Sequence, residues 1–247
     1  MPKGYLCLVL HGHLPYVYHP EAEDHLEERW FFEALTECYI PLLQVMEGWL
    51  RDGIKFRLSL SLSSPLISML TNSILQERYC AHLEKLIELS DKEIKRTKGQ
   101  PAFNSLAAYY RDYFGQTLHY FKDKKGKNLL PAFKSLSESS GLELFACCGT
   151  HPYLPLVKNE ESVKAHIKAA MDLFYLNLGK YPKGMWLPEC AYRTGIEQHF
   201  AEFGLKYFFL DTHGFFYASP QPRYGVSAPV YAGNGVAAFG RDPESSQ

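Results

Sequence analysis

Two histidines separated by one glycine follow an apolar run near the start of the chain. The stretch LVLHGHLPY carries His11 and His13 directly after the apolar residues 4–10. In an extended chain, side chains two residues apart point to the same side, so both imidazoles can face one site. Imidazole binds transition metals and also exchanges hydrogen bonds with polar ligands. The motif therefore indicates a functional site at the end of a first strand and leaves both kinds of ligand open.

Nearly every other segment that we expect to form a strand also ends in a polar or titratable residue. In parallel barrels the carboxyl ends of the strands lie at one face, and the active site is built there. We therefore expect these residues to share one functional site with the two histidines. They are Ser63, Ser64, His151, Glu189, Asp211, His213, Arg241 and Asp242.

The segment GMWLPECAY, residues 184–192, is the most specific of these strand ends. Glu189 follows Trp186 and two further apolar residues, and the second of them, Pro188, cannot donate to a sheet. The chain must therefore leave the sheet there, and we expect the carboxylate to be half enclosed by apolar groups. Such an environment suits a nucleophile or a general acid–base. By residue type alone, a glutamate that caps the following turn is the commoner case.

One interpretation of the histidines is a zinc site. Metal-dependent deacetylases and hydrolases on barrels use sets of three nitrogens and one oxygen. The other interpretation is that the histidines hydrogen-bond sugar hydroxyls and hold the carboxylates in place. Spacing does not separate the two. The residues of the zinc set would be His11, His13, His151 and Asp211.

Apolar runs of strand length alternate along the chain with segments of helical periodicity. This alternation favours a parallel sheet with crossover helices, an α/β fold. Pro41 predicts a kink or break within the first helical segment, and a loop rich in Gly, Pro and Tyr is expected over 214–234. The expected strands are 4–10, 55–62, 142–148, 183–189, 206–211 and 235–242, and the expected helical segments are 26–51, 66–125, 162–179 and 194–204.

The composition is that of an ordinary globular protein, with 247 residues, 46% apolar content and a net charge of −1. The composition implies no strongly basic face, so nucleic acid is not the default partner. No apolar run approaches the roughly 20 residues that span a membrane. The six cysteines form no CxxC pair, which predicts free and mostly buried thiols in a reducing, cytoplasmic compartment.

Four motifs, HGHLPY, GTHPYLPL, WLPECAY and LDTHG, together resemble glycoside hydrolase family 57. They look most like the 1,4-α-glucan branching enzymes of that family. The resemblance runs from about Tyr5 to the last residue, with the motifs in the family's order, and WLPECAY is the most specific of them.

This resemblance implies an incomplete, TIM-like (β/α)7 barrel with a helical insertion at about 66–125. It also implies a retaining mechanism on α-1,4-glucans without metal or cofactor, in which Glu189 is the nucleophile. A branching enzyme passes the glucan to a 6-hydroxyl of another chain, as in glycogen-like polysaccharide, so a loop that excludes water is expected. The tyrosine-bearing stretch 224–231 is the candidate loop. The residues expected to contact glucan are His11, His13, His151, Trp186, Asp211, His213, Tyr224, Tyr231, Arg241 and Asp242.

The acid–base of the family is an Asp well beyond the part that GRDPESSQ resembles, and Asp211 and Asp242 do not match its motif. We therefore expect residues 1–247 to be the N-terminal portion of the catalytic barrel, truncated before the barrel closes and with little transferase activity alone. An unclosed parallel barrel leaves a strand edge open. Self-association through that edge, or dependence on a missing partner, is the expected consequence.

Three other functions stay open. An α-amylase or a 4-α-glucanotransferase of the same family would use the same nucleophile. A catalytically inactive glucan-binding module would explain the absence of the acid–base. A metal-dependent deacetylase is the interpretation in which the histidines hold zinc.

Overall fold

The computed structural model describes residues 4–21 and 25–246. The chain divides into two compact units. Unit 1 comprises Met1–Pro15, Phe56–Ile67 and Gly141–Gln247, and unit 2 comprises Tyr16–Lys55 and Ser68–Ser140. Each unit is therefore built from segments that are separated in the sequence.

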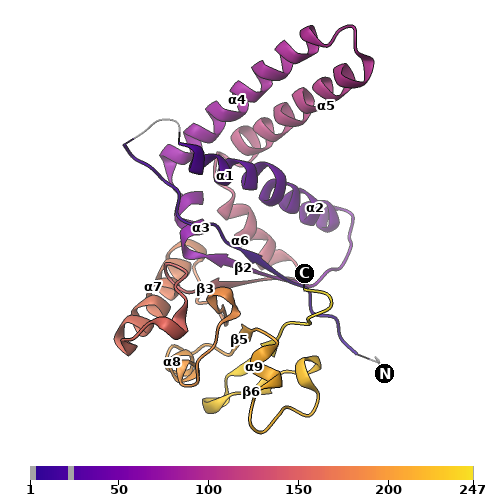
Figure 1. The fold of residues 1–247 in the computed structure, drawn as a ribbon. Helices are drawn as coiled ribbons and strands as arrows, with labels where there is room; N and C mark the ends of the chain where they lie inside the picture. Colours follow the sequence, from indigo (N-terminus) through magenta and orange to yellow (C-terminus); the bar gives the residue numbers. More distant parts are fainter. Residues whose placement is uncertain (1–3, 22–24, 247) are drawn as a thin grey trace. The chain divides into compact units, whose positions relative to one another are not determined.

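Unit 1 is organised around a seven-stranded sheet with the order β1-β2-β3-β4-β5-β7-β6. Figure 1 labels β2, β3, β5 and β6 of this sheet. Neighbouring strands are parallel except for the antiparallel pair β6–β7. β1 and β6 lie at the two edges, so the sheet formed by the described residues is open. The predicted α/β fold with an incomplete parallel barrel is confirmed. The strands are β1 (Val9–Gly12), β2 (Leu58–Ser63), β3 (Leu142–Cys147), β4 (Gly184–Trp186), β5 (Tyr207–Leu210), β6 (Val230–Tyr231) and β7 (Ala237–Gly240).

Helices connect the strands of unit 1, and those over 160–178 and 196–202 lie where the sequence predicts helices. Helix α7 begins after Asn159, whose side chain accepts a hydrogen bond from the backbone N–H of Glu161. It ends at Gly179, which adopts the left-handed conformation (φ 75°) that favours glycine. The helices of this part of the chain are α3 (Ser64–Leu70), α7 (Glu160–Leu178), α8 (Ile196–Glu202) and α9 (His213–Phe216).

The register of the sheet places side chains from successive strands in rows. Cys147 pairs with Trp186, which pairs with Phe209, which in turn pairs with Phe239. Paired residues of parallel strands point to the same face of the sheet. The rings pack accordingly, with centroids 5.8 Å apart for Trp186–Phe209 and 5.6 Å for Phe209–Phe239. This face of the sheet is thus a layer of aromatic rings.

The structure differs from the predicted elements in several places, including β1, β4 and the loop 214–234. β1 begins at Val9 rather than at residue 4, because Val9 is the first residue with a partner on β2. β4 ends at Trp186, and Glu189 lies beyond it in a one-turn 3-10 helix, η4 (Pro188–Cys190). The expected loop 214–234 contains α9 and the two-residue strand β6. A strand of two residues is too short to produce a visible alternation of apolar and polar positions.

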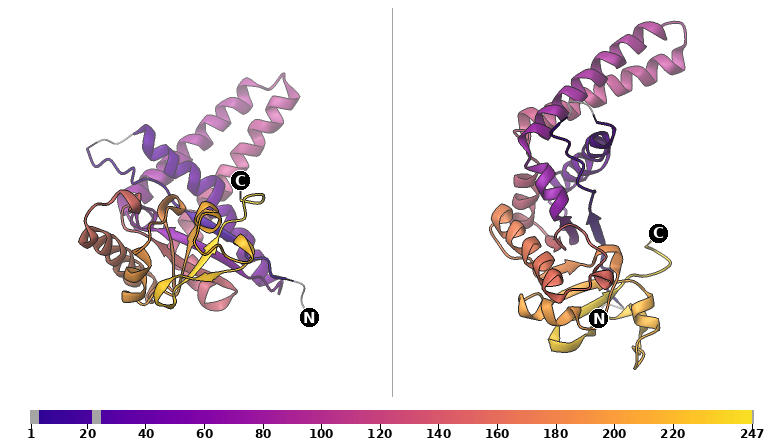
Figure 2. Two further views of the ribbon diagram at one scale, coloured as in Figure 1. Left: turned by 60° about the horizontal axis from the view of Figure 1, so that its bottom comes forward. Right: turned by 60° about the vertical axis from the view of Figure 1, so that its left-hand side comes forward.

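Unit 2 is helical, and α4 and α5 run side by side as an antiparallel hairpin (Figure 2). The predicted interruption near Pro41 takes the form of a π-helical segment, η1, that ends just before α2. Phe31 and Phe121 are buried in this unit, where the Phe121 ring meets the edge of Tyr79 at 4.8 Å. The elements are α1 (Leu26–Ala34), η1 (Leu35–Tyr39), α2 (Ile40–Arg51), α4 (Ser73–Arg96), α5 (Pro101–Leu118), η2 (His119–Lys124) and α6 (Leu130–Ser139).

The cysteines are free thiols, as predicted. Cys7 and Cys38 are exposed, whereas Cys80, Cys147, Cys148 and Cys190 are buried. Within the described ranges, no helix combines the length and the apolar composition that crossing a bilayer requires.

Replacing Gly141 with alanine is expected to destabilise unit 1. A Cβ at this position would stand 1.8 Å from the carbonyl oxygen of Phe56, a backbone atom that cannot rotate away. We expect Gly141→Ala to lower the free energy of unfolding by about 1–3 kcal/mol, as overpacking does, measured by urea denaturation.

Gly115 in α5 serves as the matched control, because a Cβ there meets nothing within 4 Å. Gly115→Ala is expected to raise stability by about 0.5–1 kcal/mol through helix propensity. Equal stability of the Gly141→Ala variant and the wild type would contradict the close approach.

Candidate active site

Three imidazoles meet at the carboxyl ends of β1 and β3, and we call His11, His13 and His151 the histidine cluster. The rings of His13 and His151 stack with centroids 3.6 Å apart and planes 10° apart. Nε2 of His11 lies 3.3 Å from Nε2 of His151. The indole of Trp186 stacks on His11 at 4.4 Å and 12°. The structure therefore brings four of the sequence-predicted site residues into one wall.

Two buried serines of β2 hold the histidines of the first strand. Oγ of Ser61 and Nδ1 of His11 share a hydrogen bond of 2.5 Å, and Oγ of Ser63 and Nδ1 of His13 share one of 2.9 Å. These bonds engage Nδ1 of both rings and leave Nε2 for other contacts. From the sequence, Ser63 is predicted only as a strand end, and Ser61 is not predicted as a site residue. The signal that was available is the alternation LSLSLS, which places small hydroxyl side chains on one face.

The histidine cluster is uncharged at neutral pH. Burial, followed by the neighbouring histidines, lowers the pKa of His11 to about 3 and that of His13 to about 4. Burial also lowers the pKa of His151, although the carboxylate of Glu189 opposes this shift. A neutral imidazole offers one N–H donor and one nitrogen acceptor. The cluster can therefore exchange hydrogen bonds with hydroxyl groups in both directions.

Glu189 lies in a left-handed turn beside the histidine cluster. Its backbone has φ 54° and ψ 22°, and Oε1 lies 3.9 Å from Nδ1 of His151. The side chain is 72% exposed, so the expectation that apolar groups half enclose it is wrong. The physical reason is the left-handed conformation, which turns the side chain away from the buried residues Leu187 and Pro188.

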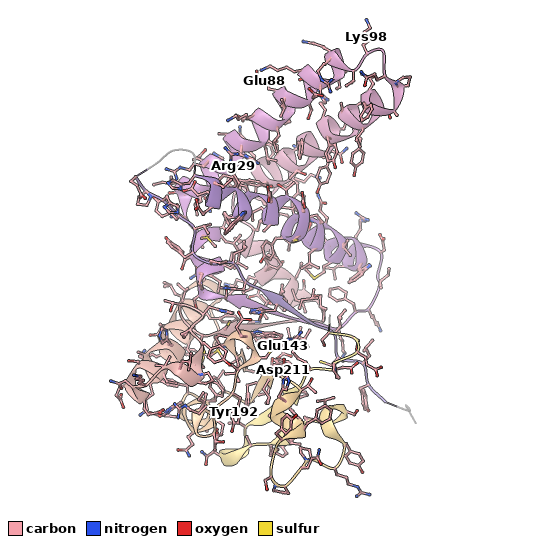
Figure 3. All side chains as sticks on the ribbon, in the orientation of Figure 1. Arg29, Glu88, Lys98, Glu143, Tyr192 and Asp211 are labelled. Carbon is pink, nitrogen blue, oxygen red and sulfur yellow. The ribbon has the colours of Figure 1, made fainter. Side chains whose placement is uncertain are left out.

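A second group surrounds Asp211, which follows β5 and is labelled in Figure 3. Nδ1 of His213 lies 2.8 Å from Oδ1 of Asp211, and Nη1 of Arg241 lies 3.8 Å from Oδ2. With Asp242 these residues line a hollow of about 410 Å³. The backbone N–H of Asp211 donates to the carbonyl of Cys190 at 3.0 Å, which ties this hollow to the turn that carries Glu189.

The two predicted tyrosines lie elsewhere. Tyr224 is 63% exposed and lies against the guanidinium of Arg223, while Tyr231 is 82% exposed and belongs to the edge strand β6. Neither is part of the histidine cluster, and neither lines the hollow around Asp211. Their predicted contact with glucan stays a prediction.

A different set of possible metal ligands gathers in unit 1 from the one that the sequence suggested for zinc. Among the described residues, the buried thiol of Cys147 lies near His11 and His151. One ligand atom from each of the three residues lies within 4.8 Å of the other two. From the sequence, Cys147 is predicted only to be a free, buried thiol. A separate group in unit 2 comprises His19, Glu21 and His25.

Comparison with known families gives one match over nearly the whole chain. The profile of glycosyl hydrolase family 57 matches residues 7–247. Among curated proteins, the 1,4-α-glucan branching enzyme TK1436 of Thermococcus kodakarensis is 32% identical over 225 residues, which cover 85% of this chain and 33% of that protein.

Two solved structures share the fold closely. The α-amylase AmyC of Thermotoga maritima has a TM-score of 0.93 and 44% identity, covering 100% of this chain and 47% of that one. The GH57-type branching enzyme of Pyrococcus horikoshii has a TM-score of 0.90 and 30% identity, covering 98% of this chain and 48% of that one.

The chain thus spans between 33% and 48% of the length of these three proteins. The shared region contains the open parallel sheet and the strand ends that carry the histidine cluster and Glu189. Because the family profile matches residues 7–247, this chain belongs to glycosyl hydrolase family 57.

Proposed function

We propose that this chain is the N-terminal portion of the catalytic barrel of a 1,4-α-glucan branching enzyme, with Glu189 as the nucleophile. The observation that carries the proposal is the exposed carboxylate of Glu189 beside a wall of neutral imidazoles and one indole. The relatives named as branching enzymes support the activity.

In the proposed reaction, the carboxylate of Glu189 attacks the anomeric carbon of an α-1,4-linked glucose and forms a covalent glycosyl-enzyme. A second carboxyl group about 5–5.5 Å away protonates the leaving oxygen and later activates the 6-hydroxyl of the acceptor chain. We propose that this acid–base Asp belongs to a part of the protein beyond Gln247. The mechanism uses no metal and no cofactor.

The remaining site residues have proposed roles in holding the glucan. The indole of Trp186 offers an apolar face to a sugar ring, and the histidine cluster exchanges hydrogen bonds with sugar hydroxyls. Asp211, held by His213 and Arg241, accepts hydrogen bonds from a neighbouring glucose unit. The stretch 224–231 is the proposed loop that keeps water from the glycosyl-enzyme.

A second candidate is an α-amylase of the same family, which the 44% identity to AmyC favours. The two activities share the glycosyl-enzyme and differ in its acceptor, since water gives hydrolysis and a glucan 6-hydroxyl gives a branch. A 4-α-glucanotransferase would use a 4-hydroxyl instead. New α-1,6 linkages in the product distinguish the branching enzyme from both.

Replacing the nucleophile tests the proposal, in a protein that also contains the proposed acid–base Asp. With amylose as substrate we expect new α-1,6 linkages, measured as chains released by a debranching enzyme. Glu189→Gln is expected to lower kcat by more than about 10³-fold, because an amide cannot form the glycosyl-enzyme. A 5-fluoro-glycosyl fluoride is expected to label Glu189, as detected by peptide mass spectrometry.

Glu202→Gln, at an exposed position near the end of α8, is the matched control and should retain full activity. The 247-residue chain alone should produce no branch points. Labelling of a different carboxylate would overturn the assignment of Glu189. Reducing ends without α-1,6 linkages would favour the amylase, and binding of maltooligosaccharide without turnover would favour an inactive binding module.

We further propose that the 247-residue chain self-associates through β1, which lies at an edge of the sheet. The backbone groups on the outer side of an edge strand can pair with a second chain. Size-exclusion chromatography with light scattering should give a mass above that of one chain. A monodisperse monomer with a cooperative melting transition would contradict this prediction.

A further inference from the structure

The histidine cluster adjoins a thiol that the proposed reaction does not use. We propose that His11, His151 and Cys147 form a binding site for a thiophilic divalent ion of the zinc class. The ion would occupy imidazoles that the proposed function assigns to sugar hydroxyls, so ion and glucan would exclude each other there, and the test of the ion site needs no activity.

The two imidazole nitrogens are already at the spacing that zinc requires. A tetrahedral zinc ion holds each nitrogen at about 2.0–2.1 Å, which places two nitrogen ligands roughly 3.3–3.4 Å apart. Nε2 of His11 and Nε2 of His151 are 3.3 Å apart. Sγ of Cys147 and one ring nitrogen of each histidine all lie within 4.8 Å of one another. Binding would bring the thiol toward the ion until Zn–S is about 2.3 Å.

The register of the sheet explains why the thiol lies beneath the histidines. Cys147 pairs with Ser63 on one side and with Trp186 on the other. Ser63 bonds to His13, and Trp186 stacks on His11, so these residues share the face that carries the histidine cluster. The sulfur therefore points into the same site as the imidazoles.

The surroundings of His11 match those of a metal ligand, and a carboxylate lies near the second nitrogen of His151. A metal-binding imidazole usually presents its second nitrogen to a hydroxyl, carbonyl or carboxylate oxygen, which fixes the ring. Nδ1 of His11 bonds to the buried Oγ of Ser61. Nδ1 of His151 faces Oε1 of Glu189 at 3.9 Å. Both rings therefore present Nε2 to the proposed ion.

The donor set selects the class of ion. Two imidazoles and one thiolate suit zinc or copper and disfavour magnesium and calcium, which prefer oxygen ligands. On binding, the thiol proton of Cys147 passes to solvent and the sulfur bonds as thiolate. Three protein ligands leave a fourth position for water.

The test uses the chelator-treated 247-residue chain and two probes, Zn²⁺ followed by calorimetry and Co²⁺ followed by absorption. We expect tight zinc binding, and a cobalt complex with a thiolate charge-transfer band and tetrahedral d–d bands. Cys147→Ser should abolish the charge-transfer band and weaken zinc binding by at least tenfold. Cys148→Ser, which changes the neighbouring buried thiol, is the matched control and should keep both signals.

His19→Gln removes a ligand of the separate group in unit 2 and should leave the charge-transfer band unchanged. Zinc X-ray absorption on the wild-type chain gives a measurement that does not depend on how a variant folds, and we expect one sulfur and two imidazoles around the ion. A first shell without sulfur, or a charge-transfer band that survives Cys147→Ser, would overturn the proposal.

Discussion

The candidate site depends on the pairing of β1 with β2, which places His11 opposite Ser61. Within this parallel register the serine hydroxyl reaches Nδ1 of the imidazole, and the next serine along β2 reaches His13 in the same way. A shift of one residue would turn every side chain of β1 to the other face of the sheet. The orientation of His11 and His13 follows from this one register.

Backbone strain is concentrated at the same strand ends. His151, Glu189 and Cys190 adopt positive φ values of 59°, 54° and 52°, although none is glycine. Each such position costs on the order of 1–3 kcal/mol and persists only where the surroundings hold it. Here the backbone N–H of His151 donates to the carbonyl of Cys148, and that of Cys190 donates to the carbonyl of Leu187. The hydrogen-bonded turns hold the backbone in the conformation that presents Glu189 to solvent.

Much of the fold could be predicted from the sequence, because apolar runs and helical periodicity report directly on burial. The parallel order of strands and the polar residues at their ends follow from that pattern, and the motif WLPECAY pointed to Glu189. What the pattern does not contain is conformation at single residues. The pattern of apolar and polar residues does not reveal that Glu189 has a left-handed φ. The exposure of its side chain was therefore predicted wrongly. The short strand β6 and the contact of Cys147 with the histidines likewise depend on pairing between distant segments.

Unit 2 is formed by two segments of the chain, one between β1 and β2 and the other between β2 and β3. Pairing of these three strands therefore requires two long loops to close, which costs conformational entropy and slows folding. The contacts within the α4–α5 hairpin are by contrast local in sequence. If the helical unit folds first, each long loop becomes a compact body and the entropic cost of bringing the strands together falls. Unit 2 would then govern how fast the histidine-bearing strand finds its partner, although it contributes none of the three imidazoles.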